Sequence, residues 1–305
     1  MSEPVSITNS MVNTARDCWY KYYLEYIRKL TPVAEAEYFV WGEMVHRVAE
    51  GMKHGKELDE SVIEMRGEFE LATPRHSVEE YERYERFCLL LPYTFNGHYL
   101  KYHSEDEYYE PVFAEEKFEI PIRNGYVLKG KIDGVFRDVR DGKLLVHEVK
   151  TAAQTGVSYW NRLPLDLQIR IYLFAVQKGY GFQTNKVLYD VFKKPMAQQV
   201  VRESETAEEW AQRIGVVYLR DNKKQYERQI IEVRQELIDQ IPHDLDVFIQ
   251  ELEFHESNTF YPQHHPGNRK GGCDFFKICV FGEDSWAEGE FFTRHNKHPE
   301  LEGRK

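Results

Sequence analysis

Three β-rich segments follow one another between residues 109 and 151, and only short turns separate them. The first contains VFAEEKFEIPI, the second is YVLKGKIDGVFRD and the third is LLVHEVKT. Arg123-Asn124-Gly125 and Asp141-Gly142 supply residues that tight turns favour. Strands joined by such short connections pair with their sequence neighbours in antiparallel fashion. The sequence therefore predicts a three-stranded antiparallel meander.

Helical patterns precede the meander. Apolar and aromatic periodicity predicts one helix from Thr8 to Lys29 and a second from Phe39 to Lys53, ending near Gly55. Ser77 and Glu80 resemble a capping box that opens a third helix running towards Leu91. The first hundred residues are therefore expected to be mainly helical.

Alternating elements follow the meander. We expect a helix over 163–179 that stops at Gly179, a strand over 185–192, and a helix from a Thr206–Glu209 capping box to about Leu219. Residues 225–233 could form a strand, 234–254 favour a helix broken at Pro242, and the tail is irregular. This order predicts an α/β (α+β) fold with a central mixed sheet flanked by helices.

Composition narrows the class of protein. The chain has 305 residues, and its 42% apolar content indicates a globular protein. The 40 Lys and Arg are outnumbered by 51 Asp and Glu, so the net charge of −11 gives no general attraction for nucleic acid, and any phosphate-binding face must be local. No stretch approaches the roughly 20 apolar residues that span a bilayer, and no signal pattern opens the chain. We therefore expect a cytoplasmic protein without a membrane partner.

Asp133, Glu148 and Lys150 are the residues most indicative of chemistry. Side chains alternate along a strand, so Glu148-Val149-Lys150 directs the acid and the lysine to one side and Val149 to the other. Asp133 lies on the neighbouring strand, where an ordinary register places it beside Glu148. Carboxylate oxygens bind Mg²⁺ or Mn²⁺, and a nearby ammonium can orient a water for phosphodiester hydrolysis. By pattern alone, a cross-strand salt bridge remains an alternative.

The surrounding motifs resemble a known family. Gln168 and Tyr172 stand four residues apart on the next helix and share one face of it. The order His46, Gly130-x-x-Asp133, Glu148-x-Lys150, Gln168-x-x-x-Tyr172 resembles the RecB-like exonuclease branch of the PD-(D/E)XK nuclease superfamily, which includes CRISPR-associated and phage exonucleases. The resemblance spans most of the chain and implies a restriction-endonuclease-like core.

The resemblance also implies roles for these residues. Asp133 and Glu148 correspond to metal ligands, the carbonyl of Val149 completes the coordination sphere, and Lys150 positions or activates the attacking water. His46 corresponds to a further metal ligand on an upstream helix. Gln168 and Tyr172 correspond to a motif that supports the active site and the nucleic-acid strand. An acidic position before the hairpin corresponds to Glu115 or Glu116, and the sequence leaves that choice open.

The cysteines suggest a second feature at the chain ends. Many RecB-like nucleases hold a [4Fe-4S] cluster with one cysteine near the N-terminus and three near the C-terminus. Cys18, Cys273 and Cys279 resemble three of these ligands. The fourth cysteine is missing, and Cys88 lies in the apolar run FCLLL, where a buried structural thiol is expected. His264 or His265 could complete a cluster or a zinc site, or the cysteines could be a remnant without metal.

Four lysines could hold a phosphate backbone: Lys129, Lys131, Lys193 and Lys194. The alternative for each is an ordinary solvent-exposed lysine on a strand.

The expected organisation is a helical N-terminal region (1–108), a nuclease core (109–222) and a C-terminal strand, helix and cysteine-bearing clasp (223–305), together forming one compact unit. The expected function is a Mg²⁺- or Mn²⁺-dependent DNA exonuclease in recombination, repair or phage DNA processing, working with DNA and with a helicase or recombination protein. A catalytically silent nucleic-acid-binding or scaffold protein and an RNA-acting nuclease are the alternatives.

Overall fold

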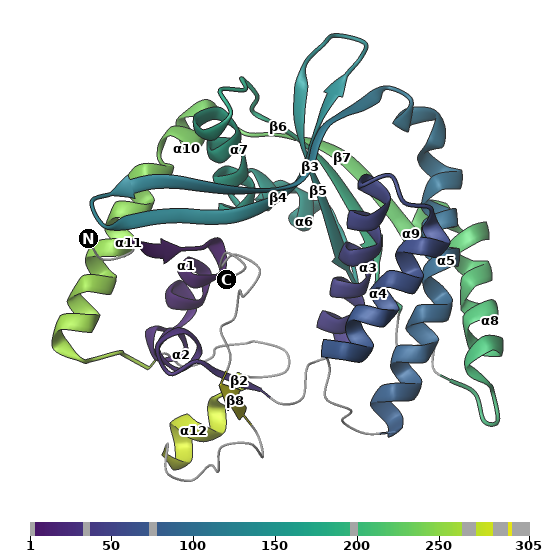
Figure 1. Cartoon of the computed structure of the whole chain (residues 1–305), viewed down its shortest axis with the longest axis horizontal. Helices are drawn as coiled ribbons and strands as arrows, with labels where there is room; N and C mark the ends of the chain where they lie inside the picture. Colours follow the sequence, from purple (N-terminus) through teal and green to yellow (C-terminus); the bar gives the residue numbers. More distant parts are fainter. Residues whose placement is uncertain are drawn as a thin grey trace.

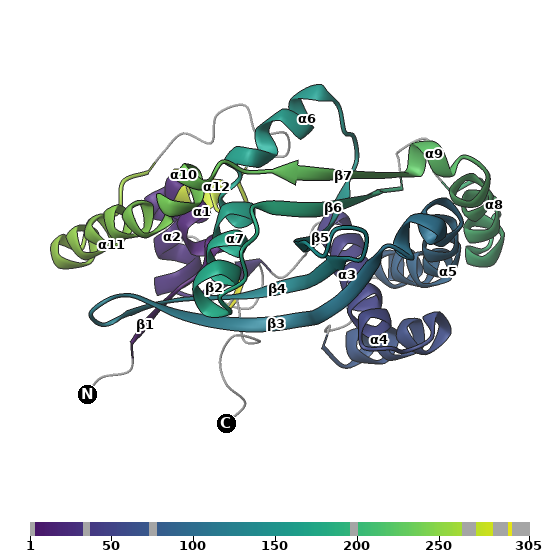
Figure 2. The same cartoon turned by 90° about the horizontal axis from the view of Figure 1, so that it is seen from above.

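The computed structural model describes residues 4–32, 37–72, 78–195, 201–263, 273–282 and 292–294. Its centre is a six-stranded mixed sheet with the order β1-β4-β5-β6-β7, and β3 pairs with β4 outside this path (Figures 1 and 2). The strands of this sheet are β1 (Val5–Ile7), β3 (Tyr109–Arg123), β4 (Tyr126–Asp138), β5 (Leu144–Ala152), β6 (Lys186–Lys193) and β7 (Tyr226–Glu232).

The predicted meander is confirmed. β3 and β4 are antiparallel along nearly their whole length, and β4 and β5 are antiparallel between Gly134–Arg137 and Leu144–His147. Gly125 and Gly142 turn the chain with φ values of +84° and +73°, which other residues rarely adopt. β1 was not predicted, and it pairs with β4 in parallel over only three residues.

A helical crossover connects β5 to β6. It consists of α6 (Val157–Arg162), a 3₁₀ turn (Leu163–Leu165) and α7 (Leu167–Gly179), and it returns the chain so that β5 and β6 are parallel. β7 then pairs antiparallel to β6 at the edge of the sheet. The predicted helix, strand and further strand are therefore confirmed, whereas α6 was not predicted.

Helices cover both faces of the sheet. One hydrophobic core contains Val146 and Val191 from the sheet together with residues of α1, α7 and α11, and the other contains Val149 and Phe192 together with residues of α3, α5 and α8. In Figure 1 the second group gathers at one end of the molecule. The helices around the sheet, besides α6 and α7, are α1 (Asn9–Asp17), α3 (Glu37–Lys53), α4 (Leu58–Ala72), α5 (Val78–Asp106), α8 (Ala207–Arg220), α9 (Asn222–Gln225), α10 (Gln235–Asp239) and α11 (Ile241–Asn258).

Several predicted helix boundaries are wrong. The expected first helix is interrupted at Cys18, whose extended backbone separates α1 from α2 (Trp19–Tyr22) and a π-helical turn (Tyr23–Ile27). The break near Pro242 falls at Gln240 instead, because proline at the start of α11 needs no backbone N–H there.

Other boundary predictions had mixed outcomes. Gly179 is the last residue of α7, and it is Gly181 that adopts positive φ. The third helix continues past Leu91 to Asp106, and α4 was not predicted. The Thr206 capping box is confirmed with both of its hydrogen bonds, whereas Ser77 lies outside the described residues.

The two ends of the chain contact each other. β2 (Leu30–Pro32) pairs antiparallel with β8 (Phe292–Arg294), and α12 (Phe276–Phe281) follows a segment whose Phe275 packs with Ile278 against Leu24. The Tyr20 backbone N–H donates a 3.1 Å hydrogen bond to the Pro262 carbonyl. The predicted C-terminal clasp is therefore present, although it includes a helix and a short strand that were not predicted. Along the described ranges, no helix is long and apolar enough to cross a bilayer.

Candidate active site

The pairing between β4 and β5 stops part-way along both strands. Gly134 and His147 are the last partners in this register, after which β4 continues beside β3 and β5 continues beside β6. The two strands therefore form a fork, and Asp133 and Glu148 begin its two arms. The Asp133 carboxylate bridges the fork, because its Oδ2 accepts a 2.9 Å hydrogen bond from the Val149 backbone N–H. The structure thus brings together the two acids that the sequence singled out.

Glu148 is buried, with only 1% of its surface exposed. Burial raises the pKa of its carboxyl to about 8, although the Lys150 ammonium, which forms an ion pair with Oε1, opposes the rise. Oε2 has no hydrogen-bond partner within the described part of the chain, and Oε1 contacts the Lys150 ammonium. Buried polar atoms are nearly always satisfied in folded proteins, so Oε2 is available to an incoming cation.

Lys150 lies on the same side of β5 as Glu148, as strand alternation predicted. Burial would lower the pKa of its ammonium, but the charges of Glu148 and Asp133 outweigh burial and raise that pKa. Lys150 therefore carries its proton at neutral pH and can donate hydrogen bonds to a bound anion or water.

Gln168 and Tyr172 meet on α7, which Asp166 caps at its N-terminus. Gln168 Nε2 donates a 2.8 Å hydrogen bond to the Tyr172 hydroxyl oxygen. Burial raises the pKa of Tyr172 well above its usual value, and the charges of Glu148 and Asp133 raise it further. The phenol thus stays protonated and lies close enough to the two acids to sense their charge.

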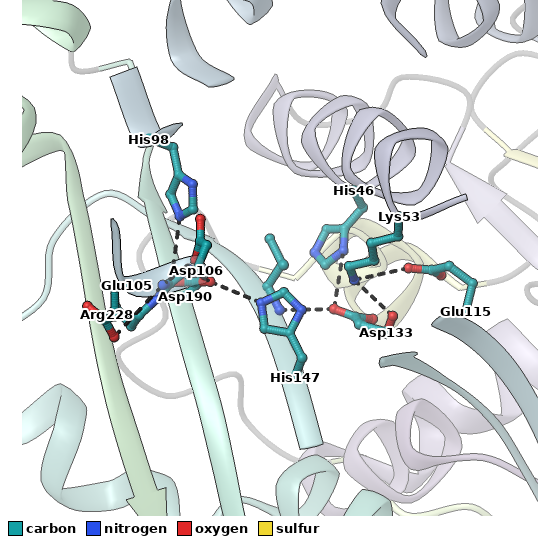
Figure 3. A network of polar contacts seen from close by, with 11 residues as sticks. His46, Lys53, His98, Glu105, Asp106, Glu115, Asp133, His147, Asp190 and Arg228 are labelled. Atoms are coloured by element: carbon teal, nitrogen blue, oxygen red, sulfur yellow. Dashed lines mark hydrogen bonds and ion pairs between the residues drawn. The ribbon is translucent and has the colours of Figure 1, made fainter. Parts of the chain in front are cut away.

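Helix α3 contributes the opposite wall of the site. His46, Glu50 and Lys53 share one face of this helix because they are spaced four and three residues apart. Figure 3 shows His46 and Lys53 directed towards Asp133. His46 Nδ1 lies 3.8 Å from Asp133 Oδ2, and Lys53 Nζ donates a 2.9 Å hydrogen bond to the Asp133 backbone carbonyl. Burial lowers the pKa of His46, which favours the neutral imidazole that metals bind.

The tertiary structure distinguishes Glu115 from Glu116. Glu115 adopts a left-handed backbone with φ +52°, which is uncommon outside glycine, and its side chain is only 7% exposed. Its carboxylate lies 3.3 Å from Lys53 Nζ and 2.7 Å from Lys131 Nζ, and Figure 3 shows it beside Asp133. Glu116 is exposed. Glu115 is therefore the acid that faces the fork.

The donors at the fork fit a hard divalent cation. Burial would raise the pKa of Asp133, but His46, Lys53 and Lys150 outweigh it and lower that pKa to about 2, so this carboxylate is ionised. Asp133 and Glu148 offer oxygen ligands, and the Val149 backbone N–H contacts Asp133 Oδ2. No three His, Cys, Asp or Glu side chains of the described ranges form a complete metal site by themselves. Mg²⁺ suits such a partial set, because it commonly binds one or two carboxylates and retains several waters.

A family comparison agrees with this geometry. The model of the PD-(D/E)XK nuclease superfamily matches residues 6–279, which is most of the chain. The chain belongs to this superfamily. Its central mixed sheet flanked by helices is the restriction-endonuclease-like architecture that the sequence predicted.

Three solved structures are similar to this superfamily member at low sequence identity. A candidate exonuclease from Eubacterium rectale is 11% identical, with a TM-score of 0.48 and coverage of 91% of this chain and 93% of that chain. An alkaline exonuclease from Laribacter hongkongensis is 12% identical, with a TM-score of 0.29 and coverage of 70% and 89%. The same exonuclease in complex with dAMP is 14% identical, with a TM-score of 0.28 and coverage of 73% and 95%. No curated protein matches the sequence.

The three clasp cysteines of this superfamily member are neighbours. A Cys18 thiolate would raise the pKa of both Cys273 and Cys279, whose pKa values burial already raises. Cys18 Sγ also accepts a 3.4 Å hydrogen bond from the Lys21 backbone N–H. Cys88 lies in the other core with α3 and α8, so it is the structural thiol that the sequence predicted. His264 and His265 lie outside the described residues.

Three of the four candidate phosphate-binding lysines contact acids of the chain itself. Lys131 contacts Glu115 at 2.7 Å and Lys193 contacts Glu227 at 2.8 Å. Lys129 contacts the exposed Glu119 at 2.6 Å. Burial lowers the pKa of Lys194. Lys131 lies closest to the fork, since the Glu115 that it contacts faces Asp133.

Sequence reasoning missed two groups around the site. Lys53 could have been found, because it follows His46 by two helical turns and therefore shares its face of α3. His147 and Asp190, which lie on neighbouring strands and contact each other, carry no local sequence signal.

Proposed function

We propose that this protein is a metal-dependent deoxyribonuclease that acts as an exonuclease in DNA recombination, repair or phage DNA processing. The membership of the PD-(D/E)XK superfamily supports a hydrolytic nuclease. The observation that carries the proposal is the fork, where the buried Glu148 carboxyl lies beside Asp133, with Oε1 paired to the Lys150 ammonium and Oε2 without a hydrogen bond in the described part of the chain. A silent scaffold has no need to bury an acid and a lysine beside a second acid, because such burial costs free energy of folding.

Each residue of the fork has a separate role in this proposal. Asp133, Glu148 and the Val149 carbonyl would hold Mg²⁺ or Mn²⁺, with His46 as a further ligand. A metal held there would supply Lewis-acid polarisation of the scissile phosphate and would lower the pKa of the attacking water. Lys150 keeps its proton, so it orients the attacking water and stabilises negative charge on the phosphoryl oxygens. From α7, Gln168 would contribute its side-chain amide and Tyr172 its protonated hydroxyl, and the two groups are joined by a hydrogen bond.

The proposal is tested by digestion of end-labelled linear DNA and covalently closed circular DNA. We expect the linear substrate to be degraded from its ends with Mg²⁺ or Mn²⁺, the circle to persist, and EDTA to stop the reaction. Cleavage of the circle would make the enzyme an endonuclease. Degradation of a matched RNA but not of the DNA would make it a ribonuclease, and absence of any cleavage under all metal conditions would favour a silent scaffold.

A second expected result concerns His46. His46→Ala should raise the Mn²⁺ concentration needed for half-maximal activity by about tenfold, because removing a ligand or its support weakens metal affinity. The shift with Mg²⁺ should be smaller, since imidazole suits Mn²⁺ better than Mg²⁺. The measurement is a titration of activity with each metal. The matched control is His103→Ala, which changes an exposed histidine of α5. Identical titration curves for His46→Ala and the unmodified chain would assign His46 a purely structural role.

A third expected result concerns the clasp, for which three thiols are available and the fourth ligand of a [4Fe-4S] cluster is missing. If no metal is bound there, Cys18→Ser should lower the free energy of unfolding by about 1 kcal/mol, because the thiol loses only its hydrogen bond with the Lys21 N–H. Phe275→Ala should cost about 3–5 kcal/mol, because Phe275 is fully buried against Leu24.

Thermal unfolding of both variants, with iron, sulfide and zinc analysis of anaerobically purified protein, checks this expectation. A larger loss for Cys18→Ser together with iron and sulfide would show that a cluster holds the clasp. One zinc per chain with the same loss would instead show a zinc site.

A further inference from the structure

A buried polar network adjoins the fork on the side away from α7. Asp190 of β6 is 2% exposed and accepts a 3.0 Å hydrogen bond from His147 Nε2 of β5. Arg228 of β7 grips the same carboxylate at two points, with Nε donating to Oδ1 at 2.7 Å and Nη2 donating to Oδ2 at 2.9 Å. Figure 3 shows the network running from Arg228 through Asp190 to His147, next to Asp133.

The network is also anchored to the helical layer. Arg228 Nη1 donates a 2.6 Å hydrogen bond to Asp106 at the end of α5, and its guanidinium lies 4.3 Å from the centre of the Tyr102 ring. His98 of α5 places Nε2 3.7 Å from Asp190 Oδ1, which is too long for a hydrogen bond. Strands β5, β6 and β7 are thereby tied to α5 through one carboxylate.

His147 occupies a special position in the sheet. It is the last residue of β5 that pairs with β4, so β5 pairs on both edges at Val146 and His147 and with β6 alone from Glu148 onwards. Beyond this point the backbone of β4 has moved away, and the Asp133 carboxylate takes over as acceptor for the Val149 N–H. The position of Glu148 relative to Asp133 therefore depends on how firmly β5 is fixed at His147.

Stability alone gives a weak reason for this network. Buried ion pairs recover little more than the cost of removing their charges from water. His147 is also incompletely satisfied, since its Nδ1 is buried and has no hydrogen-bond partner among the described residues. His147, His98 and Arg228 together outweigh burial and hold the pKa of Asp190 well below its usual range, so the carboxylate stays charged as the centre of the network.

We propose that His147, held by Asp190 and Arg228, is a positioning residue that fixes Glu148 at the apex of the fork in the geometry needed to bind a divalent cation. This role deepens the proposed function and rests on it, because it presupposes a metal at Glu148. Residues that orient metal ligands from behind can influence metal affinity as strongly as some ligands do.

The test compares two amides at one position by calorimetric titration of the metal-free full chain with Mn²⁺. In His147→Gln the side-chain amide reaches the position of Nε2 and can still donate to Asp190, whereas the amide of His147→Asn is too short to reach it. We expect the Mn²⁺ Kd to rise by about tenfold in His147→Asn and by less than about threefold in His147→Gln. Activity and thermal unfolding are measured on the same samples.

A matched control separates positioning from general loss of stability. Arg213 of α8 donates two hydrogen bonds to the Glu205 carboxylate, from Nε at 2.6 Å and from Nη2 at 2.7 Å, which is the same geometry as Arg228 with Asp190. Glu205→Gln should leave the Mn²⁺ Kd unchanged. Equal weakening in all three variants, or an unchanged Kd in His147→Asn, would overturn the inference. If the unmodified chain itself does not bind Mn²⁺, the proposed function fails as well, so the two failures are distinguishable.

A second variant decides the matter if His147→Asn does not fold. Arg228→Lys keeps a positive charge beside Asp190 but removes the planar two-point grip. We expect the folded Arg228→Lys protein to bind Mn²⁺ at least about threefold more weakly than the unmodified chain, because the network then holds β5 less firmly. A Kd equal to that of the unmodified chain would contradict the proposed positioning.

Discussion

Glu148→Gln is expected to reduce DNA cleavage at least about a thousandfold, which corresponds to about 4 kcal/mol of transition-state stabilisation. The amide keeps the size of the side chain but replaces one hard anionic oxygen with a nitrogen that cannot bind Mg²⁺. The metal-free protein should melt at a similar temperature, because the loss of the ion pair with Lys150 is offset by removal of the cost of burying an ionisable carboxyl. The measurements are single-turnover cleavage of labelled DNA and thermal unfolding without metal.

Two comparisons sharpen this result. Asp133→Ala should be equally inactive, but it should also destabilise the fork, because Asp133 accepts the Val149 N–H. Glu116→Gln changes an exposed acid nearby and should retain full activity. Cleavage by Glu148→Gln at the unmodified rate would exclude Glu148 as a metal ligand.

Lys150→Ala is expected to lower the cleavage rate by about a hundredfold to a thousandfold while Mn²⁺ binding persists. Lys150 carries its charge at neutral pH and forms an ion pair with Glu148, so its ammonium lies where negative charge develops during hydrolysis. Its removal leaves both carboxylates in place. A calorimetric Mn²⁺ titration and a cleavage assay on the same sample distinguish the loss of chemistry from the loss of metal.

Lys143→Ala provides the control for this variant. Lys143 also forms an ion pair with a nearby acid, because its Nζ lies 2.8 Å from Asp141 Oδ2 in the same turn before β5. Unlike Lys150, its side chain is 65% exposed. This variant should cleave DNA at the normal rate. Loss of Mn²⁺ binding in Lys150→Ala would show that the lysine supports the metal site rather than the attacking water.

The sequence by itself determined the meander and the placement of Asp133, Glu148 and Lys150. Strand side chains alternate with a strict period of two, so Glu148 and Lys150 had to share a side. The connections between the strands are too short to allow any pairing other than antiparallel neighbours, which made β4 and β5 neighbours and so brought Asp133 and Glu148 to the same end of their pairing. Gln168 and Tyr172 followed in the same way from the helical repeat. These relations are local, and local geometry is encoded in sequence spacing.

Only the tertiary structure decided the rest of the site. Glu115 and Glu116 are adjacent in sequence, and it was the left-handed backbone at Glu115, stabilised by Lys53 and Lys131, that turned one of them towards the fork. The contact between His147 and Asp190 joins residues 43 positions apart on strands connected by a helical crossover. Such contacts depend on how separate elements pack, and packing energies are summed over many weak contacts distributed along the chain, so no short sequence pattern records them.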